Sequence, residues 1–198
     1  KTNEELELAV NNGSLIHIDH FDELYQLITL SDQLNKKPRV AIRVNMDTGI
    51  YPMWDRFGFN YENGQAFSAL SKIVESGKME LIGLHCHIGT FMLSTDAYAT
   101  AVKKLGDLAW KCKTQLNNSI QYIDLGGGFP SANTLRGSFL PGTDNVPSVD
   151  EFAEAITKSL LQIGFGADEM PLLILESGRV LIDDAGYLLA SVIANKRL

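Results

Sequence analysis

The chain alternates short, almost continuously apolar runs with longer segments in which apolar residues recur every three or four positions. The runs span residues 15–19, 39–45, 81–87, 121–125 and 172–176. A strand that is apolar along its whole length is buried on both faces, as in parallel sheets. Strands alternating with helices predict an α/β fold with right-handed crossovers, either an open doubly wound sheet or a (β/α)8 barrel. Five strands are too few to close a barrel of eight.

The signals for helix ends agree with this pattern. Residues 2–5 and 148–151 both have the Ser/Thr-x-x-Glu form of a capping box, which marks a helix start. Gly77 and Gly164 follow apolar stripes and are typical stop signals. A further helix is expected to open near Ser94. The order is therefore a helix followed by five strand-and-helix units.

Composition narrows the class of protein. With 198 residues, the chain is one large domain or part of one. A net charge of −7 argues against a nucleic-acid binder, so a small molecule is the expected partner. No apolar run approaches the length of a membrane span, and we expect no secretory signal. Cys86 and Cys112 are too few for a disulfide framework, which fits a reducing cytoplasm. Residues 131–147 are expected to form a surface loop, and residues 187–195 a last hydrophobic stretch.

Residues able to do chemistry gather where the predicted strands end. Arg43 lies near the end of the second strand, His87 closes the third, Gly126 follows the fourth and Glu176 closes the fifth. In both candidate folds this edge binds ligands, because its loops line one crevice. The sequence therefore predicts a small-molecule site at this edge.

Three successive glycines, Gly126, Gly127 and Gly128, follow the fourth strand. Glycines let the backbone approach a ligand closely and can point amides into a concavity that suits a phosphate. The alternative is a tight turn in which they merely relieve crowding. The run matches neither the dinucleotide fingerprint, which needs a glycine where Ser131 stands, nor a P-loop.

Glu176 and Arg179 lie three residues apart across a Ser-Gly link. Arg179 could clamp a phosphate or a carboxylate with its planar guanidinium, and Glu176 could hold a protonated ring nitrogen. The alternative is that the two side chains form a salt bridge with each other and close the loop.

His85 and His87 share one face of their strand, and Cys86 faces the other way. They could ligate a metal, pack flat on an aromatic cofactor, or be hydrogen-bonded core residues. A metal hydrolase of this type needs further ligands downstream, where neither His17 nor His20 lies, so we expect no metal. Cys86 is a weak candidate nucleophile because it faces away from both imidazoles.

Taken in order, five motifs resemble the fold-type III pyridoxal phosphate decarboxylases, which include diaminopimelate, ornithine and arginine decarboxylases. The resemblance covers nearly the whole chain. Ser177 stands where that family usually has proline, and Thr90 begins a segment that departs from its usual Ser-Gln-Ile or Ser-Gly-Cys. The five motifs are Arg43-Val44-Asn45, Arg56-Phe57-Gly58, Gly83-Leu84-His85-Cys86-His87-Ile88-Gly89-Thr90, Asp124-Leu125-Gly126-Gly127-Gly128-Phe129 and Glu176-Ser177-Gly178-Arg179.

The resemblance assigns roles to individual residues. His87 would stack on the cofactor ring and Glu176 would pair with the pyridine nitrogen, which makes these the expected catalytic residues. Arg43 and Asp124 would support them from behind, and Arg179 would also meet the substrate carboxylate. The expected cofactor-binding residues are His87, Thr90, Gly126, Gly127, Gly128, Glu176, Gly178 and Arg179.

The resemblance also implies an alanine-racemase-type (β/α)8 barrel followed by a β domain, in a cytoplasmic homodimer with shared active sites. The chain would be a partial barrel of about strands four to eight, with residues 1–186 in the pyridoxal phosphate domain and 187–198 leading to the β domain. The Schiff-base lysine of the family lies before the segment resembling this chain's start, so the chain alone should be inactive. The full-length protein would decarboxylate a basic or dibasic amino acid such as diaminopimelate, ornithine, lysine or arginine.

Two other functions stay open. An amino-acid racemase shares the barrel, but racemases resembling alanine racemase place an arginine beside the ring nitrogen, where this chain has Glu176. The other is a non-catalytic relative that binds the cofactor and has lost the chemistry.

Overall fold

A computed structural model describes residues 1–131, 146–183, 185–186 and 188–196 of the chain. Its sheet is parallel, and the main path runs in sequence order as β1-β2-β4-β5-β6. Each of the five predicted strands is present, with ends within two residues of the prediction. The short strand β3, which was not predicted, pairs with β2 alone. The strands are β1 (Ile16–Ile18), β2 (Arg39–Asn45), β3 (Phe59–Asn60), β4 (Glu80–Cys86), β5 (Tyr122–Asp124) and β6 (Leu172–Ile174).

The helices begin and end where the sequence signals predict. Both capping boxes are formed, with the Thr2 hydroxyl accepting from the Glu5 amide and Ser148 from Glu151. Gly77 ends its helix in the left-handed conformation, and Ser94 is the N-cap residue of the helix that follows it. The helices are α1 (Asn3–Asn11), α2 (Phe21–Leu34), α3 (Gln65–Ser76), α4 (Thr95–Leu116), α6 (Val149–Gln162), the 3-10 turn η1 (Ala167–Glu169) and α7 (Gly178–Ile182).

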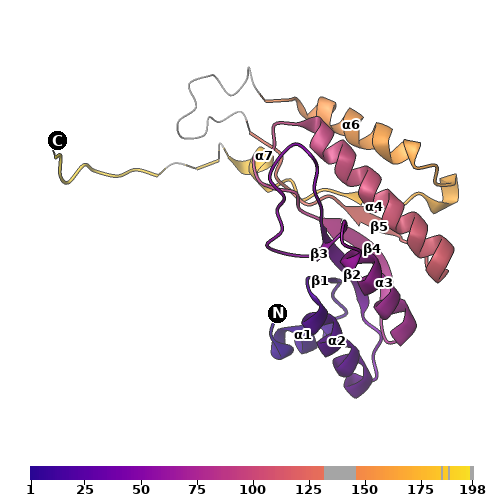
Figure 1. Ribbon diagram of the computed structural model, residues 1–198. Coiled ribbons are helices and arrows are strands. Elements are labelled where there is room, and N and C mark those ends of the chain that lie inside the picture. The colour runs from indigo at the N-terminus through magenta and orange to yellow at the C-terminus, as the bar shows by residue number, and fades with distance from the viewer. Residues whose placement is uncertain (132–145, 184, 187, 197–198) are drawn as a thin grey trace.

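Strand order decides between the two candidate folds. A doubly wound sheet reverses its order at a switch point, whereas the strands of a (β/α)8 barrel follow one another around the sheet. Here every strand of the main path lies beside its neighbour in sequence. Figure 1 shows α3, α4 and α6 along one side of the sheet, and α1 and α2 at the β1 end. The fold is a five-strand segment of a (β/α)8 barrel, and the doubly wound alternative is excluded.

The two faces of the sheet are unequally covered. The face toward the helices holds the main core, which includes Leu24, Leu70, Leu84, Leu105 and Ile156. The second cluster contains only Ala41, Ile82 and Tyr122, with Ile174 packed beside them. Polar side chains occupy much of the second face, which would be the interior of a closed barrel.

The last described stretch of the chain, residues 188–196, is exposed along its whole length. Residues 188–196 form neither helix nor strand, and their apolar side chains, such as Leu188 at 95% exposed and Ile193 at 97%, lie in solvent. Most of the expected loop at 131–147 lies outside the described residues. Among the helices that are described, none has the length and apolar character needed to cross a membrane.

Candidate active site

The lowest layer of the site crosses four strands in register. His17 of β1 lies beside Ala41 of β2, which lies beside Gly83 of β4 and then Tyr122 of β5. Because the two middle residues carry at most a methyl group, His17 Nε2 and the Tyr122 hydroxyl reach each other at 2.9 Å. A Cβ atom on Gly83 would lie 2.0 Å from the Tyr122 ring. The glycine is therefore required for this contact.

The next layer carries most of the charge. Arg43, His85 and Asp124 lie in register on β2, β4 and β5. Glu176, from the loop after β6, brings its Oε1 to 3.6 Å from His85 Nε2, and the His85 ring lies 4.7 Å from that of His17. One oxygen of Asp124 accepts from the Gly126 amide at 2.8 Å. Three strands and two loops thus converge on one acidic and imidazole-rich point.

Burial determines the protonation of this layer. It lowers the pKa of His85 to about 3, aided by the neighbouring His17 and Arg43, and it lowers the pKa of His17 as well. The His85 Nδ1 atom has no hydrogen-bond partner among the described residues. Burial also raises the pKa of Asp124 to about 6, and the nearby Glu176 carboxylate raises it further, against the opposing Gly126 hydrogen bond. At neutral pH both imidazoles are uncharged.

The raised pKa of Asp124 predicts a pH-dependent stability. This carboxyl holds its proton more tightly in the folded state than in the unfolded state. Its contribution to the free energy of unfolding is therefore complete below about pH 4 and is lost as the pH rises through about 6. Asp124→Asn keeps an oxygen for the Gly126 amide but cannot ionise. As the pH rises through this window, the free energy of unfolding of the variant should increase by about 1–2 kcal/mol relative to that of the wild type. Urea unfolding at each pH measures the difference. The matched control is Asp55→Asn, at an exposed carboxyl. A constant difference across the window would contradict the assignment.

The upper layer joins three loops by backbone contacts. The Glu176 amide donates to the Gly126 carbonyl at 2.8 Å, and the Met92 amide donates to the Gly128 carbonyl at 2.9 Å. A Cβ atom would meet Cys86 O at 2.4 Å from Gly126, Glu176 O at 2.6 Å from Gly127, and Gly89 O at 2.2 Å from Gly128. The triple glycine is therefore needed for the loops to approach each other, as the tight-turn alternative holds.

His87 is oriented by this glycine loop. Its Nδ1 accepts from the Gly127 amide at 3.3 Å, so a neutral ring carries its proton on Nε2. Burial lowers the pKa of His87, with Arg43 adding to the effect. The ring is partly exposed. The Gly126 amide thus donates to Asp124 and the Gly127 amide to His87, so both already have an acceptor within the protein.

Arg179 and Glu176 do not pair with each other, so the loop-closing salt bridge considered above is absent from the described residues. An Arg179 amino group lies 3.8 Å from Asp183, one turn along α7, and its guanidinium lies 5.8 Å from the Phe91 ring centre. Arg179 is exposed, as are Thr90 and Gly178. A weak ion pair between exposed groups can exchange for an anionic ligand.

The structure adds residues that sequence reasoning missed. His17 and Tyr122 enter the site through strand register, which the sequence does not display. His17, His85, Asp124 and Glu176 bring one potential metal-ligating atom each to within 4.8 Å of one another. His17 lies upstream of His85 in the sequence and still meets it, because only β2 separates β1 from β4 in the sheet. Cys86 packs in the helix-side core, and burial raises its pKa to about 12, which agrees with a non-nucleophilic thiol.

The model of a known protein family matches this chain. It describes the pyridoxal-binding domain of pyridoxal-dependent decarboxylases, and it covers residues 1–183. The chain belongs to this family. Membership implies pyridoxal phosphate as the cofactor, as the resemblance of the five motifs had indicated.

Individual members of the family are similar over the whole chain. It is 29% identical to the diaminopimelate decarboxylase of Bacillus methanolicus, over 99% of this chain and 46% of that protein. It is 32% identical to that of Aquifex aeolicus, over 97% of this chain and 44% of the other. The crystal structure of the M. jannaschii enzyme in complex with L-lysine superposes with a TM-score of 0.75 at 26% identity, covering 91% of this chain and 42% of that one. The chain thus spans less than half the length of these relatives.

Proposed function

We propose that the protein to which this chain belongs removes carbon dioxide from a basic or dibasic amino acid with pyridoxal phosphate. The observation that carries the proposal is the half-exposed Glu176 carboxylate, held beside His85 and Asp124 at the same strand edge as His87. The names of the relatives support the reaction, since those cited above are diaminopimelate decarboxylases. The L-lysine complex supports a basic amino acid as the ligand class.

The residues at this edge fit the cofactor. A planar pyridine ring can stack on the partly exposed ring of His87, whose orientation is fixed at Nδ1 by the Gly127 amide. Glu176 would face the ring nitrogen. The phosphate would be held by Gly128, Gly178, Thr90 and Arg179, with Gly126 and Gly127 acting mainly by letting the loops approach. Arg179 would give up its weak contact with Asp183 to do so.

The charges of the chain suit the chemistry. Bound pyridoxal phosphate supplies an electron sink when its ring nitrogen is protonated. An ionised Glu176 keeps that proton on the nitrogen by opposite-charge pairing. Asp124 and the uncharged His85 stand behind Glu176, and Arg43 adds positive charge to the same layer. The carboxylate therefore favours the protonated ring nitrogen, which is the form of the ring that accepts electrons.

The same observation weighs against a racemase. Alanine-racemase-like enzymes are expected to place an arginine at the ring nitrogen, which leaves the ring less able to accept charge. Here the candidate partner is an acid, and Arg43 is partly exposed behind it on β2. A decarboxylase therefore remains the function that the site favours.

The test uses the full-length protein that contains this chain, loaded with pyridoxal phosphate. Diaminopimelate, lysine, ornithine and arginine are supplied separately, and both released carbon dioxide and D-isomer are measured. We expect carbon dioxide from at least one of them and none from leucine, which lacks a basic side chain. D-isomer without carbon dioxide would make the protein a racemase, and neither product would favour a non-catalytic binder. The 198-residue chain alone should give no turnover, because the Schiff-base lysine is expected outside it.

A further inference from the structure

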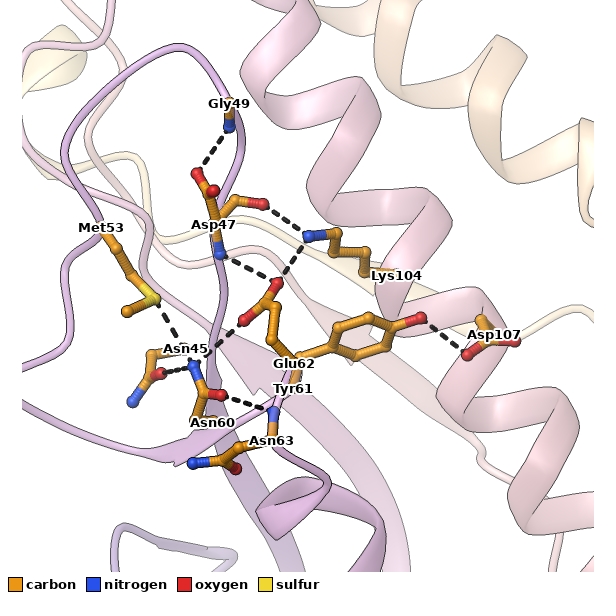
Figure 2. A network of polar contacts seen from close by, with 10 residues as sticks. All are labelled: Asn45, Asp47, Gly49, Met53, Asn60, Tyr61, Glu62, Asn63, Lys104 and Asp107. Carbon is orange, nitrogen blue, oxygen red and sulfur yellow. Dashed lines mark hydrogen bonds and ion pairs between the residues drawn. The ribbon is translucent and has the colours of Figure 1, made fainter.

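The 46–58 loop, which follows β2, is anchored at its start by polar contacts to α4 and to the turn that follows β3. Figure 2 shows Lys104 of α4 donating to the Asp47 carbonyl and to Glu62, each at 2.6 Å. The Glu62 carboxylate also accepts from the Asp47 amide at 3.1 Å. Asp47 Oδ1 accepts from the Gly49 amide at 2.7 Å and turns the chain back. The start of the loop is therefore held against α4.

The far end and the middle of the loop are also fixed. The side-chain amide of Asn45 donates to the carbonyls of Phe57 and Gly58, both at 2.8 Å. The side-chain amide of Asn60 donates to the Met53 sulfur at 3.5 Å, a contact drawn in Figure 2. At the crest, the Tyr51 hydroxyl accepts from the Leu93 amide at 3.1 Å, which ties the loop to the segment after β4. Such anchoring makes the loop a rigid support.

The 46–58 loop places Trp54 beside the candidate site. The centres of the Trp54 and His87 rings are 6.3 Å apart, and their planes meet at 82°. The Arg56 guanidinium lies 6.0 Å from the Trp54 ring centre. Trp54 is 37% exposed. Because the two rings are nearly perpendicular, a planar ligand stacked parallel to His87 would also lie perpendicular to the Trp54 indole.

We propose that Trp54 is a wall of the cofactor site, packing against the edge of the ring stacked on His87 and excluding water from that side. The inference rests on the proposed cofactor site. An edge-to-face contact between aromatic rings is favourable because the positive edge of one meets the negative face of the other. The anchored loop fixes the indole before the ligand arrives, so little conformational entropy is lost on binding.

The test exploits the presence of only two tryptophans in the chain. Trp110→Phe leaves Trp54 as the sole tryptophan, and Trp54→Phe leaves Trp110, which is 43% exposed on α4. Pyridoxamine 5′-phosphate is the probe, because it lacks the aldehyde that would react with surface lysines. Its binding to the full 198-residue chain is measured by calorimetry, and contact quenching by acrylamide is measured with and without it.

We expect saturating probe to reduce the acrylamide quenching constant of Trp54 by at least about twofold, since ligand sites bury most of the ligand and of their own walls. The constant of Trp110 should not change. Trp54→Ala should weaken probe binding by about three- to tenfold, and Trp54→Phe by less, because an aromatic contact is retained.

The outcomes separate this inference from the proposed function. If the probe binds without protecting Trp54, or binds Trp54→Ala as tightly as the wild type, Trp54 is not a wall of the site. Either result would leave the proposed cofactor site standing. No probe binding to the wild-type chain would count against both when circular dichroism shows it folded. If the isolated chain does not fold, the same comparison of wild type with Trp54→Phe and Trp54→Ala is made in the full-length protein.

Discussion

Replacing Glu176 by glutamine is expected to lower the rate of the proposed decarboxylation in the full-length protein by about 10²- to 10³-fold, the usual effect of removing one electrostatic stabiliser from an active site. The amide has the shape of the carboxylate but no charge, so it cannot hold a proton on the pyridine nitrogen. Because the Glu176 side chain is half-exposed, the substitution should leave the fold intact. Carbon dioxide release at saturating substrate measures the effect.

Asp124 lies beside Glu176, so the experiment also needs variants of this second acid. Asp124 and Glu176 each offer a ligand atom within the same 4.8 Å cluster, so Asp124 could partly replace the lost charge. The double variant with Asp124→Asn should therefore lose more activity than Glu176→Gln alone. Glu169→Gln is the matched control, since Glu169 pairs with Lys113 at 2.6 Å on the surface, and its rate should be unchanged. A wild-type rate in both Glu176→Gln and the double variant would remove Glu176 from the mechanism.

Gly83→Ala is expected to destabilise the chain by about 2–3 kcal/mol, near the upper end for an overpacked core. The added methyl carbon would lie 2.0 Å from the Tyr122 ring, which is itself buried on β5. Relief requires either strand separation or loss of the 2.9 Å hydrogen bond between Tyr122 and His17. Urea unfolding followed by circular dichroism measures the difference.

A second glycine provides the control for Gly83. A Cβ atom on Gly106 would lie 2.1 Å from the end of the Ile163 side chain, which can rotate away. Gly106 is also inside α4, where alanine is favoured over glycine by about 1 kcal/mol. Gly106→Ala should therefore cost much less than Gly83→Ala. Adding Tyr122→Leu to Gly83→Ala should recover part of the stability, and equal losses at the two glycines would refute the packing argument.

Much of the fold could be predicted because its signals are local. The β-branched runs, the two capping boxes and the glycine stops each depend on residues a few positions apart, and all of them appear in the structure. The gathering of His87, the glycines and Glu176 at one edge follows from the parallel arrangement alone. Such features depend on backbone preferences and on the hydrophobic period, and both are properties of the local sequence.

The pairing of side chains across the sheet needed the tertiary structure. His17 meets Tyr122 across two strands only because Ala41 and Gly83 stand between them in register, and that register shifts at an irregularity between Val40 and Ala41. Arg179 turns to Asp183 along α7, and Trp54 reaches His87 from a loop anchored on α4. The contacts of His17 with Tyr122 and of Trp54 with His87 join residues distant in sequence, and a slip of one residue in strand register would point His17 or Tyr122 to the opposite face. The sequence by itself determined the strands, the helix ends and the edge where chemistry collects, and the packing of strands and loops decided which side chains meet there.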